Sequence, residues 1–141
     1  MFNNITLKGY TIKTRKDNGK EACVPCRIII SRNGDDAIIR YFNKTQKEIP
    51  FDSHEIKHIF QIGLVMSSET TVDITRKFLS DVTITKNKFA VTLTANNKNN
   101  ENCIITFSLK DWKEISNLLD TIYPVFWDVV WHLFFYCFTL I

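Results

Sequence analysis

At 141 residues, the chain has the length of a single domain built around one hydrophobic core. Its 45% hydrophobic and 23% charged residues, with only four Gly and three Pro, exclude a long disordered segment. The formal net charge of +3 comes from the first half, where basic residues outnumber acidic ones. An anionic ligand is therefore expected to meet that half.

Short strands dominate the predicted secondary structure. Runs that alternate or are rich in β-branched residues, separated by turn signals, are typical of an antiparallel sandwich or barrel. The predicted strands cover residues 5–14, 24–31, 37–42, 71–75, 82–86, 89–95 and 103–107. The loop from Asn96 to Asn100 carries no core-forming residue, and Asn18-Gly19 predicts a two-residue hairpin turn between the first two strands.

Basic residues gather around that first turn. Lys13, Arg15, Lys16 and Lys20 lie within a short window that includes Asn18-Gly19. The sequence leaves two interpretations open: a solvated turn whose charges serve solubility, or a cationic tip that meets an anion.

A helix is clearly predicted from Ser108. A hydroxyl residue at Ser108 and an acid at Asp111 form a capping-box pattern at its start. Apolar residues then recur every three or four positions, including Trp112, Ile115 and Leu119. Pro124 is expected to end the helix near residue 123, so one stripe carrying Trp112 would cover an open sheet.

Short strands closed by a C-terminal amphipathic helix resemble the pleckstrin-homology-like (PH/GRAM-like) superfold, over residues 5–123. The segment from Lys47 to Gly63 resembles the middle of that fold, where a strand gives way to a polar turn and returns as a strand. The segment from Ile104 to Ile115 resembles its last strand entering the helix. The expected fold is thus mainly β, a bent antiparallel barrel or sandwich capped by one helix, with a domain over residues 1–123. A second long helix centred on Ile56 would overturn this assignment.

The resemblance implies recognition rather than catalysis. Related domains bind phosphoinositide head groups or protein segments, and some belong to nuclear complexes. The residues that correspond to the basic cluster of the lipid-binding members are Lys8, Lys13, Arg15, Lys16, Lys20 and Arg27. Lys8 is closer to the basic pair Lys13 and Arg15 than is usual for that pattern, which favours a protein partner over a lipid head group.

An internal likeness offers a different architecture. Residues 49–59 align with residues 105–115, so the chain would be two repeats, each of three strands followed by a helix. Such a repeat is similar to the Whirly-type single-stranded-DNA-binding proteins. In that alternative, Tyr10, Tyr41, Phe42 and Phe89 would stack bases while lysines follow the backbone; otherwise these aromatic residues belong to the core.

His54-Glu-Ile-Lys-His58 matches the His-Glu-x-x-His signature of zinc peptidases. On a helix the two imidazoles would lie about 6 Å apart at their Cβ atoms, whereas on a strand their backbones would separate by about 13 Å. Since Lys57 is charged and the sequence offers no convincing third ligand, a zinc peptidase is kept only as an alternative.

Two cysteines, Cys23 and Cys26, form a Cys-x-x-Cys pair that precedes a strand-forming run. A reactive thiol needs a stabilised thiolate, typically at a helix N-terminus, so both are interpreted as structural residues. The start of the chain does not resemble a signal peptide, and free thiols in a reducing, cytoplasmic or nuclear compartment are expected.

The segment from Pro124 to Ile141 is apolar on all sides, with Asp128, His132 and Thr139 as its plainly polar residues. It is shorter than a membrane-spanning helix, so packing on the domain or on a second copy, or an end foreign to the domain, is preferred to a membrane anchor. The combined expectation is a non-catalytic intracellular binding module without a cofactor, either on its own or as one piece of a larger protein. Its ligand would be a protein segment, an anionic head group or nucleic acid.

Overall fold

The computed structural model describes residues 4–33, 36–76, 80–97, 99 and 101–122. Each half of the chain contains four strands followed by one helix. The first half comprises β1 (Asn4–Thr14), β2 (Glu21–Asn33), β3 (Asp36–Asn43), β4 (Thr45–Asp52) and α1 (Ser53–Val65). The second half comprises β5 (Thr70–Ile74), β6 (Val82–Lys86), β7 (Ala90–Asn96), β8 (Asn102–Ser108) and α2 (Leu109–Ile122).

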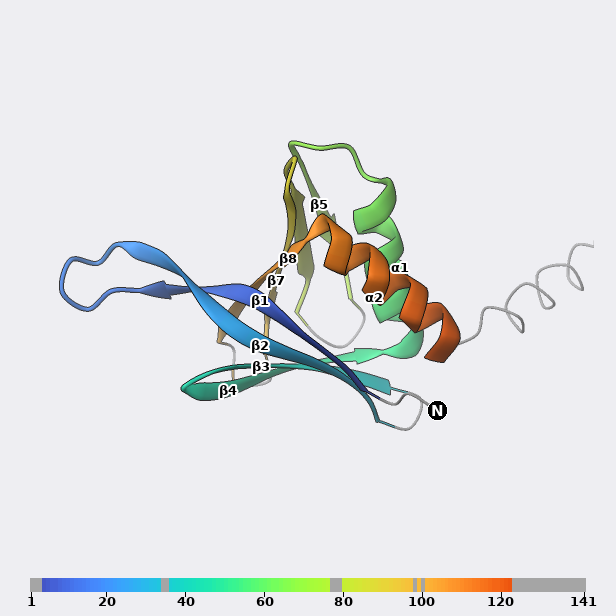
Figure 1. Cartoon of the computed structure of the whole chain (residues 1–141), viewed down its shortest axis with the longest axis horizontal. Helices are drawn as coiled ribbons and strands as arrows, with labels where there is room; N and C mark the ends of the chain where they lie inside the picture. The colour runs from blue at the N-terminus through green and yellow to red at the C-terminus, as the bar shows by residue number, and fades with distance from the viewer. Residues whose placement is uncertain (1–3, 34–35, 77–79, 98, 100, 123–141) are drawn as a thin grey trace, which may run out of the picture.

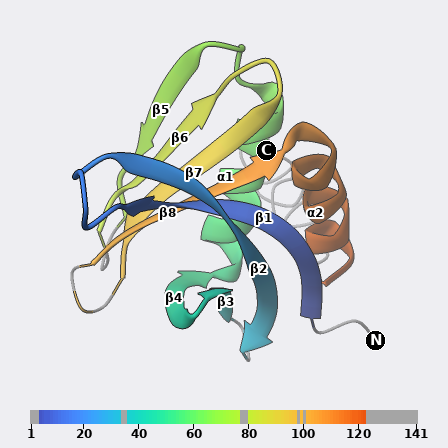
Figure 2. The ribbon, with the colours of Figure 1, turned by 60° about the vertical axis from the view of Figure 1, so that its left-hand side comes forward.

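The strands form one antiparallel sheet in the order β4-β3-β2-β1-β8-β7-β6-β5. Each half is a meander of sequential neighbours, and β1 and β8 join the two halves through the pairs Tyr10 with Thr106 and Thr11 with Ile105. The sheet is curled into a half-barrel, and both helices lie on the same face of it (Figures 1 and 2). The predicted fold class, mainly β with a curled antiparallel sheet and a C-terminal helix, is confirmed.

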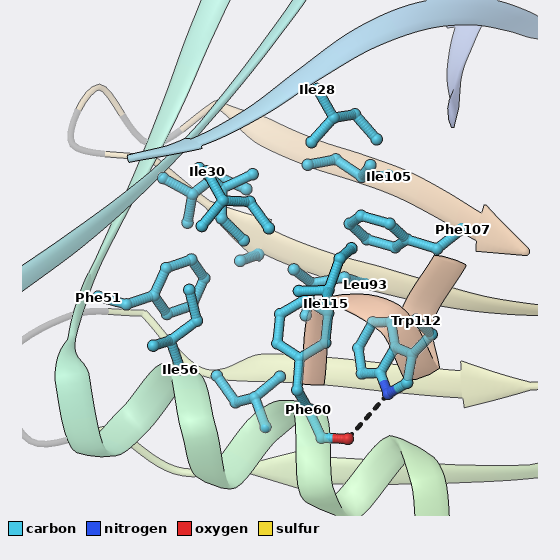
Figure 3. Close-up of a cluster of buried hydrophobic side chains, with 14 of the residues drawn as sticks. Ile28, Ile30, Phe51, Ile56, Phe60, Leu93, Ile105, Phe107, Trp112 and Ile115 are labelled. Carbon is cyan, nitrogen blue, oxygen red and sulfur yellow. Dashed lines mark hydrogen bonds between the residues drawn. The ribbon is translucent and has the colours of Figure 1, made fainter. Parts of the chain in front are cut away.

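The core lies between the inner face of the sheet and the two helices. Alternation along the strands sends Ile28, Ile30, Leu93 and Ile105 into it, each at most 2% exposed (Figure 3). This is the pattern expected when one face of an antiparallel sheet is covered and the other meets solvent. The outer face points away from α1 and α2, and no helix of the described residues covers it (Figure 2).

Trp112 of α2 is the side chain that links the two helices. Its ring stacks on Phe60 of α1 with centroids 4.0 Å apart and meets Phe107 of β8 edge to face at 5.3 Å. Its Nε1 donates to the Phe60 carbonyl over 2.8 Å (Figure 3). The ring also lies directly over Gly63, where a Cβ atom would overlap it. The predicted packing of the Trp112 stripe on the sheet is confirmed, with α1 as an additional partner.

The segment after β4 differs from the prediction that it returns as a strand. It forms α1, because Asp52 accepts from the Glu55 amide over 2.7 Å and Glu55 accepts from the Asp52 amide over 3.1 Å, a complete capping box. Ile56, Ile59 and Phe60 then share the buried side of the helix. The expected strand in the second part of residues 47–63 is therefore wrong.

The internal likeness of residues 49–59 and 105–115 corresponds to real structural equivalence. Ile49 and Phe51 end β4 with both side chains buried, as Ile105 and Phe107 do in β8. Asp52 caps α1, and Ser108 accepts from the Asp111 amide at the start of α2. Each half thus has four strands and one helix, whereas the two-repeat alternative expected three strands and one helix in each repeat.

The turn between β1 and β2 is longer than the two residues predicted. Residues 15–20 form the hairpin tip, where the Gly19 amide donates to the Arg15 carbonyl over 2.9 Å. Gly19 adopts a φ of 67°, a conformation that costs glycine little. The hairpin extends away from the rest of the sheet (Figure 1).

The apolar segment 124–141 lies outside the described residues, so the domain boundary at residue 123 stays a prediction. Neither of the helices in the described part of the chain has the length and apolar character required to cross a bilayer.

Candidate functional site

The outer face of β1 and β2 brings two cations together. Lys8 and Arg27 are cross-strand partners in the β1–β2 ladder, and both side chains are exposed. Partners that face each other in an antiparallel ladder share one side of the sheet with Cβ atoms about 5 Å apart. This pair forms the positive centre of the outer face.

Aromatic rings flank the cationic pair. Phe42 of β3 is the cross-strand partner of Arg27, whose guanidinium carbon lies 5.0 Å from the centre of the Phe42 ring. Tyr10 lies two residues beyond Lys8 on the same face, opposite Pro25, and is 51% exposed. A row of Lys8, Arg27 and Phe42 thus crosses three adjacent strands, with Tyr10 in the neighbouring row, within reach of a single extended ligand.

A hollow opens between these side chains. It measures about 560 Å³, and it is lined by Leu7, Lys8, Pro25, Arg27 and Phe42 together with Thr6 and Cys26. Its wall is mostly apolar, and its charged groups are both cations. We call this site the Arg27 hollow; hollows of this size are common for small-molecule sites.

The predicted basic cluster is divided between three places. Arg27 joins Lys8 at the hollow, Lys13 lies near the end of β1, and Arg15, Lys16 and Lys20 occupy the hairpin tip. The tip begins after Thr14, six residues from Lys8, a distance of roughly 20 Å along a strand. These residues therefore do not form one compact site for a lipid head group.

Lys13 has a local structural role. Its Nζ donates to the Asn43 backbone carbonyl over 3.2 Å and to the Asn43 Oδ1 over 3.1 Å. The Asn43 amide nitrogen in turn donates to the Pro25 carbonyl over 2.8 Å. These bonds tie the ends of three strands together beside the Arg27 hollow.

The outer face continues across the second half of the sheet as hydroxyl groups. Starting from Tyr10, successive cross-strand partners are Thr106, Thr92, Thr85 and Thr71. Thr92 and Thr106 share a hydrogen bond of 3.0 Å, and Thr71 and Thr85 one of 3.3 Å. This row is polar and uncharged, so the cationic character of the outer face is confined to its first half.

The two histidines of the zinc signature lie on α1, which places them one turn apart on its exposed side. The residue between them that would activate water is engaged elsewhere: Glu55 completes the capping box, and its Oε2 lies 3.2 Å from Nε of Arg76. In the described part of the chain, no three His, Cys, Asp or Glu side chains gather to hold a metal. His54 and His58 therefore lack a third ligand there.

The cysteine pair is divided between the two faces of the sheet. Cys23 is exposed on the hairpin, whereas Cys26 is buried. Burial, with a smaller effect of the neighbouring Cys23, raises the pKa of the Cys26 thiol to about 11. A raised pKa is the opposite of what a redox-active thiol requires, which favours the structural interpretation.

Thiol labelling is expected to separate these cysteines. In a Cys137→Ser variant at pH 8, an alkylating reagent should modify Cys23 quickly, while Cys26 and Cys103 are protected by burial. Mass spectrometry should find one label in the folded protein and three after denaturation. Equal labelling rates at Cys23 and Cys26 would contradict the described pairing of β1 and β2.

In comparisons with known proteins, the chain matches no protein-family model, and no curated protein or solved structure is significantly similar to it. Function therefore has to be inferred from the geometry and chemistry of the chain itself.

Proposed function

We propose that the chain is a non-catalytic module that binds single-stranded nucleic acid along the outer face of β1 and β2. The observation that carries this proposal is the exposed Tyr10 on the same open strand face as the paired Lys8 and Arg27. Proteins that bind single strands combine cations that follow the phosphates with aromatic rings on which bases stack. The helices occupy the other face, which leaves this one accessible (Figure 2).

The spread of the cations supports an extended ligand over a compact head group. Lys8 and Arg27 lie at the hollow, the hairpin tip lies roughly 20 Å away, and Lys13 is bonded to Asn43. The curled sheet and α2 are compatible with a pleckstrin-homology-like fold, but α1 has no counterpart in that resemblance. The two-repeat architecture associated here with single-strand binding accounts for both helices.

Fluorescence anisotropy with a labelled oligo(dT) 12-mer tests the proposal. At low salt the chain should bind this probe more tightly than a duplex of the same length, because a duplex hides its base faces. Added salt should weaken binding, with a slope of about 0.7 in log K per phosphate contact on a single strand. Tyr10→Ala should weaken binding by about 1 to 3 kcal/mol, the usual contribution of one stacked base.

Val65→Ala is the control, since Val65 is an apolar residue that is 83% exposed at the end of α1, on the helix side of the sheet. It should bind as the unmodified chain does. Absence of oligonucleotide binding at low salt would reject the proposal, because low salt is the most permissive condition. Binding to phosphoinositide vesicles instead would favour the head-group alternative, and binding to neither would favour a protein segment.

A further inference from the structure

The Arg27 hollow has the dimensions and the walls of a site for a flat, largely apolar group. Pro25 of β2 and Phe42 of β3 supply apolar side chains on the outer face, around a volume of about 560 Å³. Among the residues that line it, all of which the structure describes, none is acidic. An occupant that carried a positive charge would therefore be repelled, and one attached to anions would be attracted.

The hollow is held in shape before any ligand arrives. Phe42 and Arg27 are fixed opposite each other by the β2–β3 ladder, and their side chains form a cation–π contact at 5.0 Å. The side-chain amide of Asn43 donates a hydrogen bond to the Pro25 carbonyl over 2.8 Å, and Nζ of Lys13 donates to Oδ1 of Asn43. A wall whose groups are already ordered loses less conformational entropy when it binds.

Charge and shape together indicate one class of occupant. A nucleobase has flat faces that stack on aromatic rings and on guanidinium planes, and it is joined to phosphates on both sides. Lys8 stands at the rim next to Arg27, where it can meet such a phosphate. An apolar peptide side chain would use the apolar wall but would leave both cations without an anionic partner.

We propose that the Arg27 hollow receives one nucleobase of the bound strand, stacked on the Arg27–Phe42 pair, while Lys8 contacts a neighbouring phosphate. This inference rests on the proposed binding of single-stranded nucleic acid and assigns its base-binding subsite. The three side chains have separate roles: Phe42 and Arg27 recognise the base, and Lys8 recognises the backbone.

The test compares two probes of equal length and charge, an oligo(dT) 12-mer and a 12-mer whose central positions are abasic. The unmodified chain should prefer oligo(dT). Phe42→Leu, which keeps an apolar side chain but removes the ring, should weaken oligo(dT) binding roughly 5- to 150-fold, the range for one lost stacking contact, and should leave the abasic probe almost unaffected. Arg27→Lys keeps the charge but loses the plane, so it should also reduce the preference while preserving the salt slope.

Lys8→Gln provides the complementary variant. It should keep the preference for oligo(dT) over the abasic probe and lower the salt slope by about 0.7, the loss of one phosphate contact on a single strand. Circular dichroism and thermal unfolding check that each variant is folded. The ratio of the affinities for oligo(dT) and the abasic probe is the readout, because it does not change if part of the protein sample is unable to bind.

The outcomes separate the two proposals. If the unmodified chain binds neither probe, single-strand binding itself fails. If it binds oligo(dT) but Phe42→Leu and Arg27→Lys retain the full preference over the abasic probe, single-strand binding stands and the Arg27 hollow is not its base site.

Discussion

Replacing Trp112 with alanine is expected to lower the free energy of unfolding by about 3 to 5 kcal/mol, the usual range for a large aromatic residue removed from a core. Trp112 is 1% exposed and contacts Phe60, Gly63 and Phe107, so it touches both α1 and β8. Its loss would leave a cavity between the two halves of the chain. Urea unfolding followed by circular dichroism measures the effect.

Two further variants identify the cause. Trp112→Phe keeps one ring but removes the donor to the Phe60 carbonyl, so it should cost less than the alanine variant. Gly63→Ala should cost about 1 to 3 kcal/mol through overpacking against Trp112, although alanine is the better helix former. Phe89→Ala, at a position that is 81% exposed, serves as a control without effect. If Gly63→Ala were stabilising, the close packing of α1 on α2 would be disproved.

Local sequence signals were sufficient for most of the sheet and for α2. Strand periodicity and the cap at Ser108 depend on neighbouring residues, so β6 and α2 follow the prediction closely. The segment that became α1 was ambiguous because Ile56 and Phe60 fit both a strand and a helix. The contact that favours the helix, between Trp112 and Gly63, joins residues far apart in the sequence, whereas the capping box of Asp52 and Glu55 is a local signal for it.

The candidate site was only partly predictable, because its geometry depends on strand register. A two-residue turn at Asn18-Gly19 would pair Asp17 with Lys20 and place Lys8 opposite Ile29. The longer hairpin tip shifts the register so that Lys8 faces Arg27 and Tyr10 faces Pro25. Since the shift is by two residues, every side chain keeps its face but changes its partner. The basic residues were visible in the sequence, whereas the hollow that they form with Phe42 was not.

Arg76 is the second residue whose environment predicts a large effect. It lies between β5 and β6 at one edge of the sheet, yet it reaches the other edge: one Nη donates to the Pro50 carbonyl of β4 over 2.6 Å. Its guanidinium lies 4.7 Å from the centre of the Phe51 ring, and its Nε is 3.2 Å from Glu55. Burial lowers the pKa of Arg76, and the charge of Glu55 opposes that effect. Arg76 thus bridges the open side of the half-barrel.

Glu55→Gln should therefore destabilise the fold by about 3 kcal/mol, the low end of the range for breaking a buried ion pair, since Glu55 remains partly exposed. Glutamine can still accept from the Asp52 amide, so the loss reports mainly on the uncompensated Arg76 charge. Adding Arg76→Met removes that charge and keeps an unbranched side chain beside Phe51, so the double variant should recover much of the stability. Urea unfolding of both single variants and the double variant completes the cycle. If the free energy of unfolding of the double variant falls by the sum of the two single-variant losses, Glu55 and Arg76 are not coupled. The charge of Arg76 would then not contribute to the bridge between the sheet edges.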